Sequence, residues 1–95
     1  MKVAVEFGGG AELLFGNKKK HEVEIPASVR SMGQFLPWIR DNMLLERPEL
    51  FMQGNSIRPG ILVLINDADW CLFNQDDYEV KDGDVISFIS TLHGG

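Results

Sequence analysis

Cysteine is nearly absent from this 95-residue sequence, which contains one copy at Cys71. A single thiol excludes an internal disulfide framework, a cysteine-rich zinc site and an iron–sulfur cluster held by thiolates. The two histidines, His21 and His93, lack a matching third ligand at a recognisable spacing, so we expect no metal site. A chain without disulfides is typical of a reducing compartment, and we expect a cytoplasmic location.

Positive charge is also scarce: nine lysines and arginines face fourteen aspartates and glutamates, for a net charge of −5. This balance disfavours long-range attraction to phosphate backbones or anionic membranes, so we expect neither nucleic acid nor a membrane as a direct partner. Long hydrophobic runs are missing as well, since the longest aliphatic run covers only residues 61–65 and Glu6 interrupts a signal-peptide pattern. We therefore expect a soluble monomer.

Recognisable nucleotide and calcium motifs are lacking too. The three glycines at residues 8–10 fit neither the dinucleotide-binding pattern nor the P-loop pattern, and we interpret them as a turn. Seven carboxylates lie between Asp67 and Asp84, but a calcium loop starting at Asp67 would need an oxygen ligand at Cys71. We interpret these carboxylates as turn-forming and solubilising residues, while attraction to a basic partner stays open as an alternative.

The single thiol is a weak candidate for catalysis. Activation of a cysteine needs a nearby base or a positive field, whereas Asp67 and Asp69 close to Cys71 would disfavour the thiolate. We therefore expect Cys71 to be a buried structural residue, and an enzyme that uses it as a nucleophile is the least favoured function.

What the sequence does contain is the composition of a globular protein, with 44% hydrophobic and 24% charged residues. Its length is enough for one core and too short for two. We therefore expect one domain over residues 1–95 that ends in a Gly-Gly tail at about residues 91–95.

Two patterns of alternating apolar residues predict a hairpin at the start of the chain. The first alternation indicates a half-buried strand, and the second ends at Pro26, which lacks a backbone donor. Between them lies a long connection whose apolar residues 13–15 are expected to face protein, with their exposure left open. The alternating residues are Val3, Val5 and Phe7, followed by Val23 and Ile25.

A change of period after residue 30 predicts the main helix. Apolar residues then recur at intervals of three and four, which is the pattern of one amphipathic face. Ser31 and Gln34 have the spacing of a capping box. Pro37 lacks the N–H that should bond to Gly33, so we expect a kink or a tightened first turn there. The stripe consists of Met32, Leu36, Ile39 and Met43, with Phe35 beside it.

Three further strands are predicted in the second half of the chain. Residues 61–65 are apolar at every position, which indicates a strand covered on both faces. Residues 70–72 are expected to return as a brief paired strand after a polar turn. A turn at 81–84 precedes residues 85–90, whose apolar pattern predicts a strand in the middle of the sheet.

The resulting order of strand, strand, helix, two strands, strand predicts an α+β fold. Placing the last strand beside the first makes the two parallel, which is permitted because a helix and a long connection separate them. We therefore predict a β-grasp (ubiquitin-like) roll, with a mixed sheet of about five strands packed on one main helix.

The chain ends in Gly94 and Gly95, shortly after the last predicted strand. One interpretation is a terminus whose small residues have no role. The other is a reactive end: coupling the terminal carboxylate to AMP from ATP makes it an acyl donor. Glycine has no Cβ and gives the narrowest peptide to enter another protein's active site. A rigid strand before the tail would place it at a fixed distance from the partner. From the residues alone both interpretations stay open.

Several blocks of the sequence resemble the ubiquitin-related modifier 1 family of eukaryotic sulfur carriers, and the resemblance covers nearly the whole chain. Asp82-Gly83-Asp84 before the last strand is also similar to bacterial sulfur carriers. The chain departs from the family pattern at Pro37 and over residues 16–34. The matching blocks are residues 5–15, 46–51, 88–95 and, most recognisably, 58–70 (RPGILVLINDADW).

This resemblance implies a carrier that is a substrate of enzymes and has no catalytic residue, bound cofactor or metal. The Gly94-Gly95 tail would thread into an E1-like activating enzyme, which would adenylate Gly95 with ATP. A sulfurtransferase (rhodanese-like) domain of that enzyme would then leave a thiocarboxylate on Gly95. A tRNA thiolase complex would use the sulfur for 2-thiolation of wobble uridine in cytosolic tRNAs. The same terminus would form isopeptide bonds with lysines of target proteins, especially under oxidant stress.

A non-covalent β-grasp adaptor is the alternative function. It would dock partners through a sheet face or through the apolar residues 13–15, and its activity would survive deletion of Gly94 and Gly95. A carrier would lose its activity on the same deletion.

Overall fold

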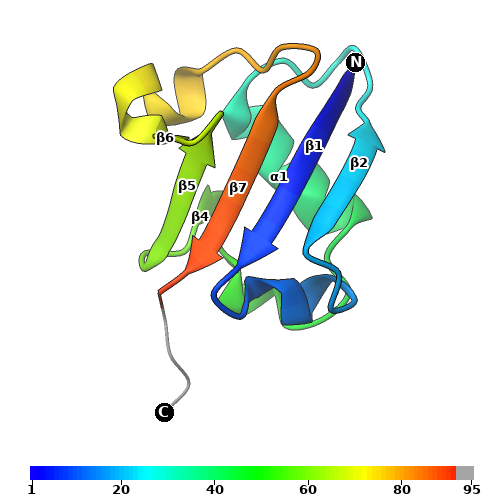
Figure 1. The fold of residues 1–95 in the computed structure, drawn as a ribbon, viewed down its shortest axis with the longest axis vertical. Helices are drawn as coiled ribbons and strands as arrows, with labels where there is room; N and C mark the ends of the chain where they lie inside the picture. Colours follow the sequence, from blue (N-terminus) through cyan, green and yellow to red (C-terminus); the bar gives the residue numbers. More distant parts are fainter. Residues whose placement is uncertain (92–95) are drawn as a thin grey trace.

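The computed structural model describes residues 1–91 of the chain. Its five-stranded sheet has the order β2-β1-β7-β5-β6, and the helix α1 (Met32–Asn42) crosses one face of it (Figure 1). The first and last strands of the sheet run parallel side by side, which confirms the predicted topology. The strands are β1 (Lys2–Gly8), β2 (Lys20–Glu24), β5 (Ile61–Ile65), β6 (Ala68–Asp69) and β7 (Val85–Ser90).

Strand pairing fixes which residues enter the core. β1 pairs antiparallel with β2 and parallel with β7, while β7 pairs antiparallel with β5. In this register Phe7, Phe88 and Val63 stand opposite one another, and all three are buried. Phe15 stacks on Phe7 with ring centroids 3.8 Å apart, and Phe51 meets Phe88 edge-on at 5.2 Å. The predicted alternation in β1 therefore points into an aromatic core.

The face of the sheet opposite α1 is only partly covered. In β5, Leu62 is 38% exposed and Leu64 is half-buried, whereas the residues that face the helix are buried. The prediction that both faces of residues 61–65 are covered is therefore wrong, because a run of aliphatic residues does not reveal whether a second layer exists. β7 lies in the middle of the sheet, as predicted.

The predicted amphipathic helix and its cap are both confirmed. The Ser31 hydroxyl accepts a hydrogen bond from the Gln34 N–H at 3.3 Å, and Gln34 Oε1 accepts one from the Ser31 N–H at 3.2 Å. The helix continues through Pro37 to Asn42 and buries Met32, Phe35, Leu36 and Ile39. Within residues 1–91 no helix has the length and apolar character needed to cross a membrane.

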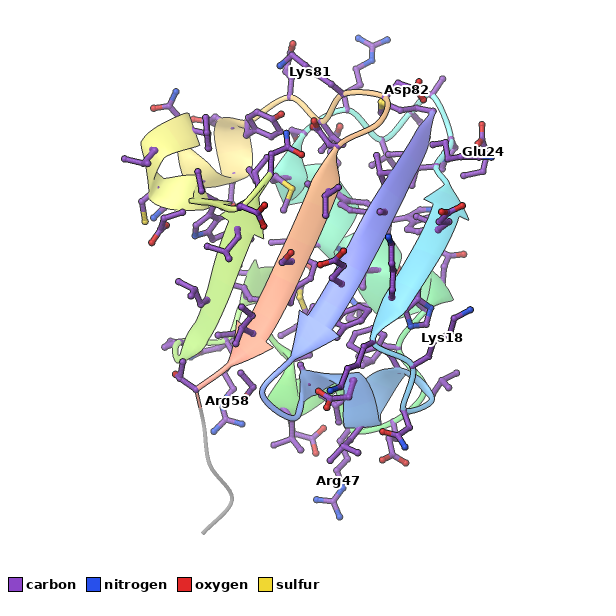
Figure 2. The ribbon with its side chains drawn as sticks, viewed as in Figure 1. Lys18, Glu24, Arg47, Arg58, Lys81 and Asp82 are labelled. Atoms are coloured by element: carbon purple, nitrogen blue, oxygen red, sulfur yellow. The ribbon has the colours of Figure 1, made fainter. Side chains whose placement is uncertain are left out.

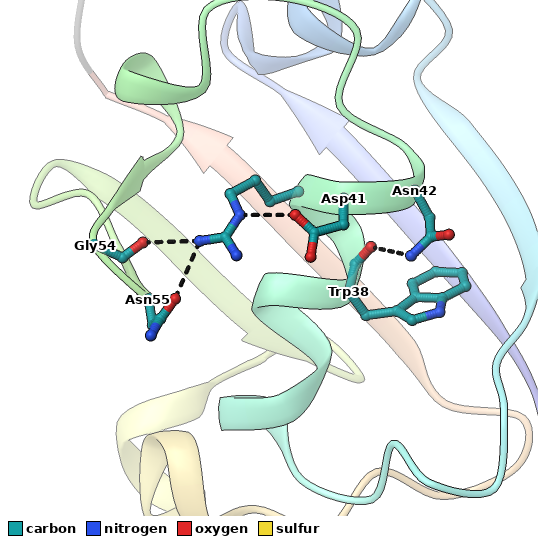
Figure 3. Close-up of polar contacts among 6 residues, drawn as sticks. Trp38, Asp41, Asn42, Gly54 and Asn55 are labelled. Carbon is teal, nitrogen blue, oxygen red and sulfur yellow. Dashed lines mark hydrogen bonds and ion pairs between the residues drawn. The ribbon is translucent and has the colours of Figure 1, made fainter.

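Arg40 connects the end of α1 to the hairpin of β3 (Met52–Gln53) and β4 (Ser56–Ile57). Figure 3 shows Gly54 and Asn55 of this hairpin joined by dashed lines to a side chain from the helix. Arg40 Nη1 donates to the Gly54 carbonyl oxygen at 3.2 Å and to Asn55 Oδ1 at 3.1 Å. Its Nε donates to Asp41 Oδ1 at 3.0 Å. One guanidinium therefore fixes the hairpin against the helix.

The segment after β5 differs from the predicted strand at residues 70–72. β6 consists of Ala68–Asp69 alone, and the chain then forms a short 3-10 helix, η3 (Trp70–Phe73). The Asp69 carboxylate accepts a hydrogen bond from the Cys71 N–H at 2.9 Å and caps this helix, which ends the strand pairing. Cys71 is exposed, so the prediction of a buried structural cysteine is also wrong.

Candidate functional site

The base of the C-terminal tail is the candidate site. The residues predicted to react, Gly94 and Gly95, lie outside the described residues, and the last residue described is Thr91. Thr91 directly follows β7, which lies between β1 and β5 (Figure 1). The segment that leads to the Gly-Gly end therefore starts from the middle of the sheet.

Thr91 is fastened to the turn that precedes β5. Its N–H donates to the Gly60 carbonyl oxygen at 2.9 Å, and its hydroxyl donates to the same oxygen. Gly60 has a φ of 99°, a conformation that favours glycine. Thr91 is thus held by two hydrogen bonds in addition to its covalent connection to β7.

Gly9, in the turn after β1, contacts the same end of β7. It adopts a φ of +66°, and a Cβ built on it would lie 2.1 Å from the carbonyl oxygen of Ser90, the last residue of β7. Only glycine permits this close approach of the turn to the strand. The predicted glycine turn is therefore confirmed at Gly9 and Gly10, whereas Gly8 is the last residue of β1.

A groove of about 800 Å³ opens beside Ser90 and Thr91. We call it the tail-base groove. Leu13 within it is 60% exposed, whereas Leu14 and the adjacent Phe15 are buried, which answers the open question about the exposure of residues 13–15. Arg58 lies near the end of β7 in Figure 2, and Arg47 projects from the same end of the molecule. The side chains that characterise the groove are Leu13, Leu14, Leu50, Ile61, Arg47 and Arg58.

The other candidate residues do not come together. Cys71 Sγ accepts a hydrogen bond from Gln75 Nε2 at 3.1 Å, with no histidine in contact among residues 1–91. His21 Nε2 lies 2.9 Å from the Lys18 carbonyl oxygen, and His93 lies outside the described residues. The described part of the chain contains no group of three or more His, Cys, Asp and Glu residues that could hold a metal ion.

Asp84 is the member of the acidic segment whose role the sequence did not reveal. It is buried and accepts hydrogen bonds from the Tyr78 hydroxyl at 2.7 Å, from Asn66 Nδ2 at 3.0 Å and from the Lys81 N–H at 2.8 Å. Burial of the phenol, its hydrogen bond to Asp84 and the Asp84 charge raise the pKa of Tyr78 to about 12. Asp84, predicted only as a turn residue, therefore joins Asn66, Tyr78 and Lys81 at the start of β7.

The fold and the tail base together define a class of protein. A mixed five-stranded sheet with parallel first and last strands and one helix across a face is the β-grasp fold, so the chain is a ubiquitin-like protein. The sequence model of the family described as Urm1 (Ubiquitin related modifier) matches residues 2–95. The chain belongs to this family, which confirms the resemblance found in the sequence and fits a protein that is not an enzyme.

Individual relatives show the same similarity over full length. The chain is 61% identical to ubiquitin-related modifier 1 of Mus musculus over 98% of this chain and 94% of the mouse protein. It is 55% identical to the ubiquitin-related modifier 1 homolog of Chlamydomonas reinhardtii, over 100% of this chain and 99% of that protein. The solution structure of Urm1 from Trypanosoma brucei is 38% identical and superposes with a TM-score of 0.83, covering 99% of this chain and 95% of that one.

Proposed function

We propose that this chain is a sulfur carrier and protein modifier that acts through the carboxyl group of Gly95. The observation that carries the proposal is a Gly-Gly end on a member of a ubiquitin-related modifier family, in which Thr91 at the tail base is fixed to Gly60. A carboxylate resists nucleophiles because of its negative charge. An E1-like activating enzyme with ATP would therefore form an acyl adenylate at Gly95 and release pyrophosphate.

Sulfur transfer then needs a donor on the enzyme. The terminal sulfur of a persulfide on its sulfurtransferase domain would attack the Gly95 carbonyl carbon, and AMP would leave with the bonding electron pair. A second thiol would cleave the resulting acyl disulfide, leaving a thiocarboxylate on Gly95 and a disulfide on the enzyme. The carrier itself supplies no catalytic residue and binds no cofactor in this scheme.

The thiocarboxylate would pass its sulfur to a tRNA thiolase complex for 2-thiolation of wobble uridine in the cytoplasm. The net charge of −5 supports a division of labour in which the enzymes, and not the carrier, bind the RNA. In the second role, the amine of a target lysine would displace the activated group at Gly95 and form an isopeptide bond.

A non-covalent adaptor is the second candidate, favoured by the partly open sheet face around Leu62 and Leu64. Deletion of Gly94 and Gly95 separates the two functions. A carrier lacking them, tested in cells without the endogenous protein, is expected to support neither tRNA thiolation nor lysine conjugation. Full activity of the deleted chain, or of a chain with an uncleavable extension after Gly95, would contradict the proposal and favour the adaptor.

A further inference from the structure

The tail-base groove combines aliphatic surface with positive charge. Leu13 and Leu50 are 60% and 36% exposed, and both line the groove beside the buried Leu14. Single exposed leucines are ordinary on a protein surface. Leucines from two segments far apart in the sequence that line one groove of about 800 Å³ form a surface into which an apolar side chain of a partner fits.

Arg47 and Arg58 supply the positive charge. Among residues 1–91 neither arginine forms an ion pair, and Arg58 Nη1 donates only to the Glu49 carbonyl oxygen at 3.4 Å. Among residues 1–91, Glu46 is the one carboxylate residue that lines the groove. Two guanidinium groups against one carboxylate give the groove an excess of positive charge on a protein whose net charge is −5. The complementary partner surface is therefore acidic.

We propose that the tail-base groove docks an extended segment of the activating enzyme that carries an apolar side chain between acidic ones. The apolar side chain packs on Leu13 and Leu50, and carboxylates meet Arg47 and Arg58. This inference rests on the proposed function, because it assigns a surface to the partner that the Gly95 chemistry requires.

The position of the groove explains why this partner would use it. Ser90 and Thr91 line the groove, so a segment bound there lies directly beside the start of the tail. Thr91 is fixed to Gly60, and Gly9 backs against Ser90, so the docked segment and the start of the tail have a defined relative position. An enzyme that binds the groove therefore holds Thr91, where the tail begins, at a defined position.

A competition experiment isolates docking from the chemistry at Gly95. The activating enzyme is assayed by ATP–pyrophosphate exchange with the wild-type chain as substrate, and a chain lacking Gly94 and Gly95 is added as a competitor. The double variant Arg47→Glu/Arg58→Glu of this competitor is expected to inhibit roughly tenfold more weakly, with a reduced dependence of its inhibition constant on salt. The control is Lys2→Glu/Arg30→Glu, which changes the net charge equally at exposed positions outside the groove.

The apolar side of the groove is tested by a second pair of variants, one inside the groove and one outside it. In the same competitor, Leu13→Ser is expected to weaken inhibition several-fold, whereas Leu72→Ser, at a leucine 75% exposed outside the groove, is expected to leave it unchanged. Urea unfolding of all variants shows whether they fold equally well. Their side chains are exposed or half-buried, so we expect similar transition midpoints.

The outcomes separate the two proposals. Equal inhibition by the wild-type competitor and by Arg47→Glu/Arg58→Glu would overturn the groove proposal, and so would equal weakening by the Lys2→Glu/Arg30→Glu control. In either case, pyrophosphate exchange with the wild-type chain as substrate would still support the carrier function. If the wild-type chain supported no exchange, the proposed function would be contradicted and the groove assignment would fail with it.

Discussion

Asp84 is the buried residue on which the contacts of the connection into β7 converge. Replacement by alanine would leave the Tyr78 hydroxyl, the Asn66 side-chain amide and the Lys81 N–H without their acceptor. We expect Asp84→Ala to lower the free energy of unfolding by about 3 kcal/mol, measured by urea denaturation. The size follows from several groups losing a partner at a site that is 6% exposed.

Asp82 provides the matched control for this substitution. Its carboxylate accepts one hydrogen bond, from the Lys2 N–H at 2.8 Å, and its side chain is exposed. We expect Asp82→Ala to cost about 1 kcal/mol or less, because water can replace the lost acceptor. Similar losses for the two aspartates would contradict the role assigned to Asp84.

Tyr78 is the single tyrosine of the chain, so its ionisation can be followed by ultraviolet absorbance without ambiguity. The native protein is expected to titrate with a pKa of about 12, against about 10 in denaturant. Because the folded pKa is the higher one, the stabilisation is complete below pH ~10 and is lost as the pH rises toward ~12. Tyr78→Phe is expected to lack this loss of stability. A native midpoint near that of the denatured chain would contradict the environment described for the phenol.

Single residues also differ in how far the sequence alone predicts their roles. Gly94 and Gly95 could be singled out because their chemistry depends on having no side chain, whatever surrounds them. Asp84 and Cys71 could not be assigned, since their burial depends on which distant residues pack over them. Asp84 is enclosed by Tyr78 and Asn66, whereas Cys71 lies on an exposed turn of 3-10 helix.

At the scale of elements, the turn after β1 determines the position of the last residues of β7. A Cβ at Gly9 would lie 2.1 Å from the Ser90 carbonyl oxygen, so Gly9→Ala must displace the strand end or the turn. We expect it to lower the free energy of unfolding by roughly 3 kcal/mol and to shift the amide NMR signals of Ser90 and Thr91.

Gly54 allows the steric part of this effect to be separated from backbone strain. Its φ is +65°, against +66° for Gly9, but a Cβ there would meet nothing within 4 Å. We expect Gly54→Ala to cost about 1 kcal/mol through the left-handed backbone alone. An equal cost at both glycines would refute the contact between the β1 turn and β7.

Elements that depend on residues close in the sequence were predictable, whereas elements that depend on contacts with distant residues were not. The start of α1 followed from Ser31 and Gln34, because a capping box is closed within one turn. The sequence could not show that the Asp69 carboxylate caps η3 instead of allowing a strand at residues 70–72. It also could not show that one face of β5 stays partly open, since that depends on which layer lies above it.

For the molecule as a whole, the sheet order was predictable because few arrangements bury an apolar last strand beside the first one. The tail-base groove was not predictable. Leu13, Arg47 and Arg58 belong to three connections that come together only in the folded chain. The same fold places Thr91 at the edge of the groove, so a partner bound in the groove lies beside the start of the tail.

The central claim is that Gly95 is activated and receives sulfur. The most direct test incubates the purified chain with ATP, a sulfur donor and an activating enzyme that has a sulfurtransferase domain, followed by mass spectrometry of the C-terminal peptide. The account predicts exchange of one oxygen for sulfur at Gly95, dependent on ATP and accompanied by pyrophosphate release. An unchanged C-terminal peptide and no pyrophosphate, with an enzyme shown to activate another member of the family, would contradict it.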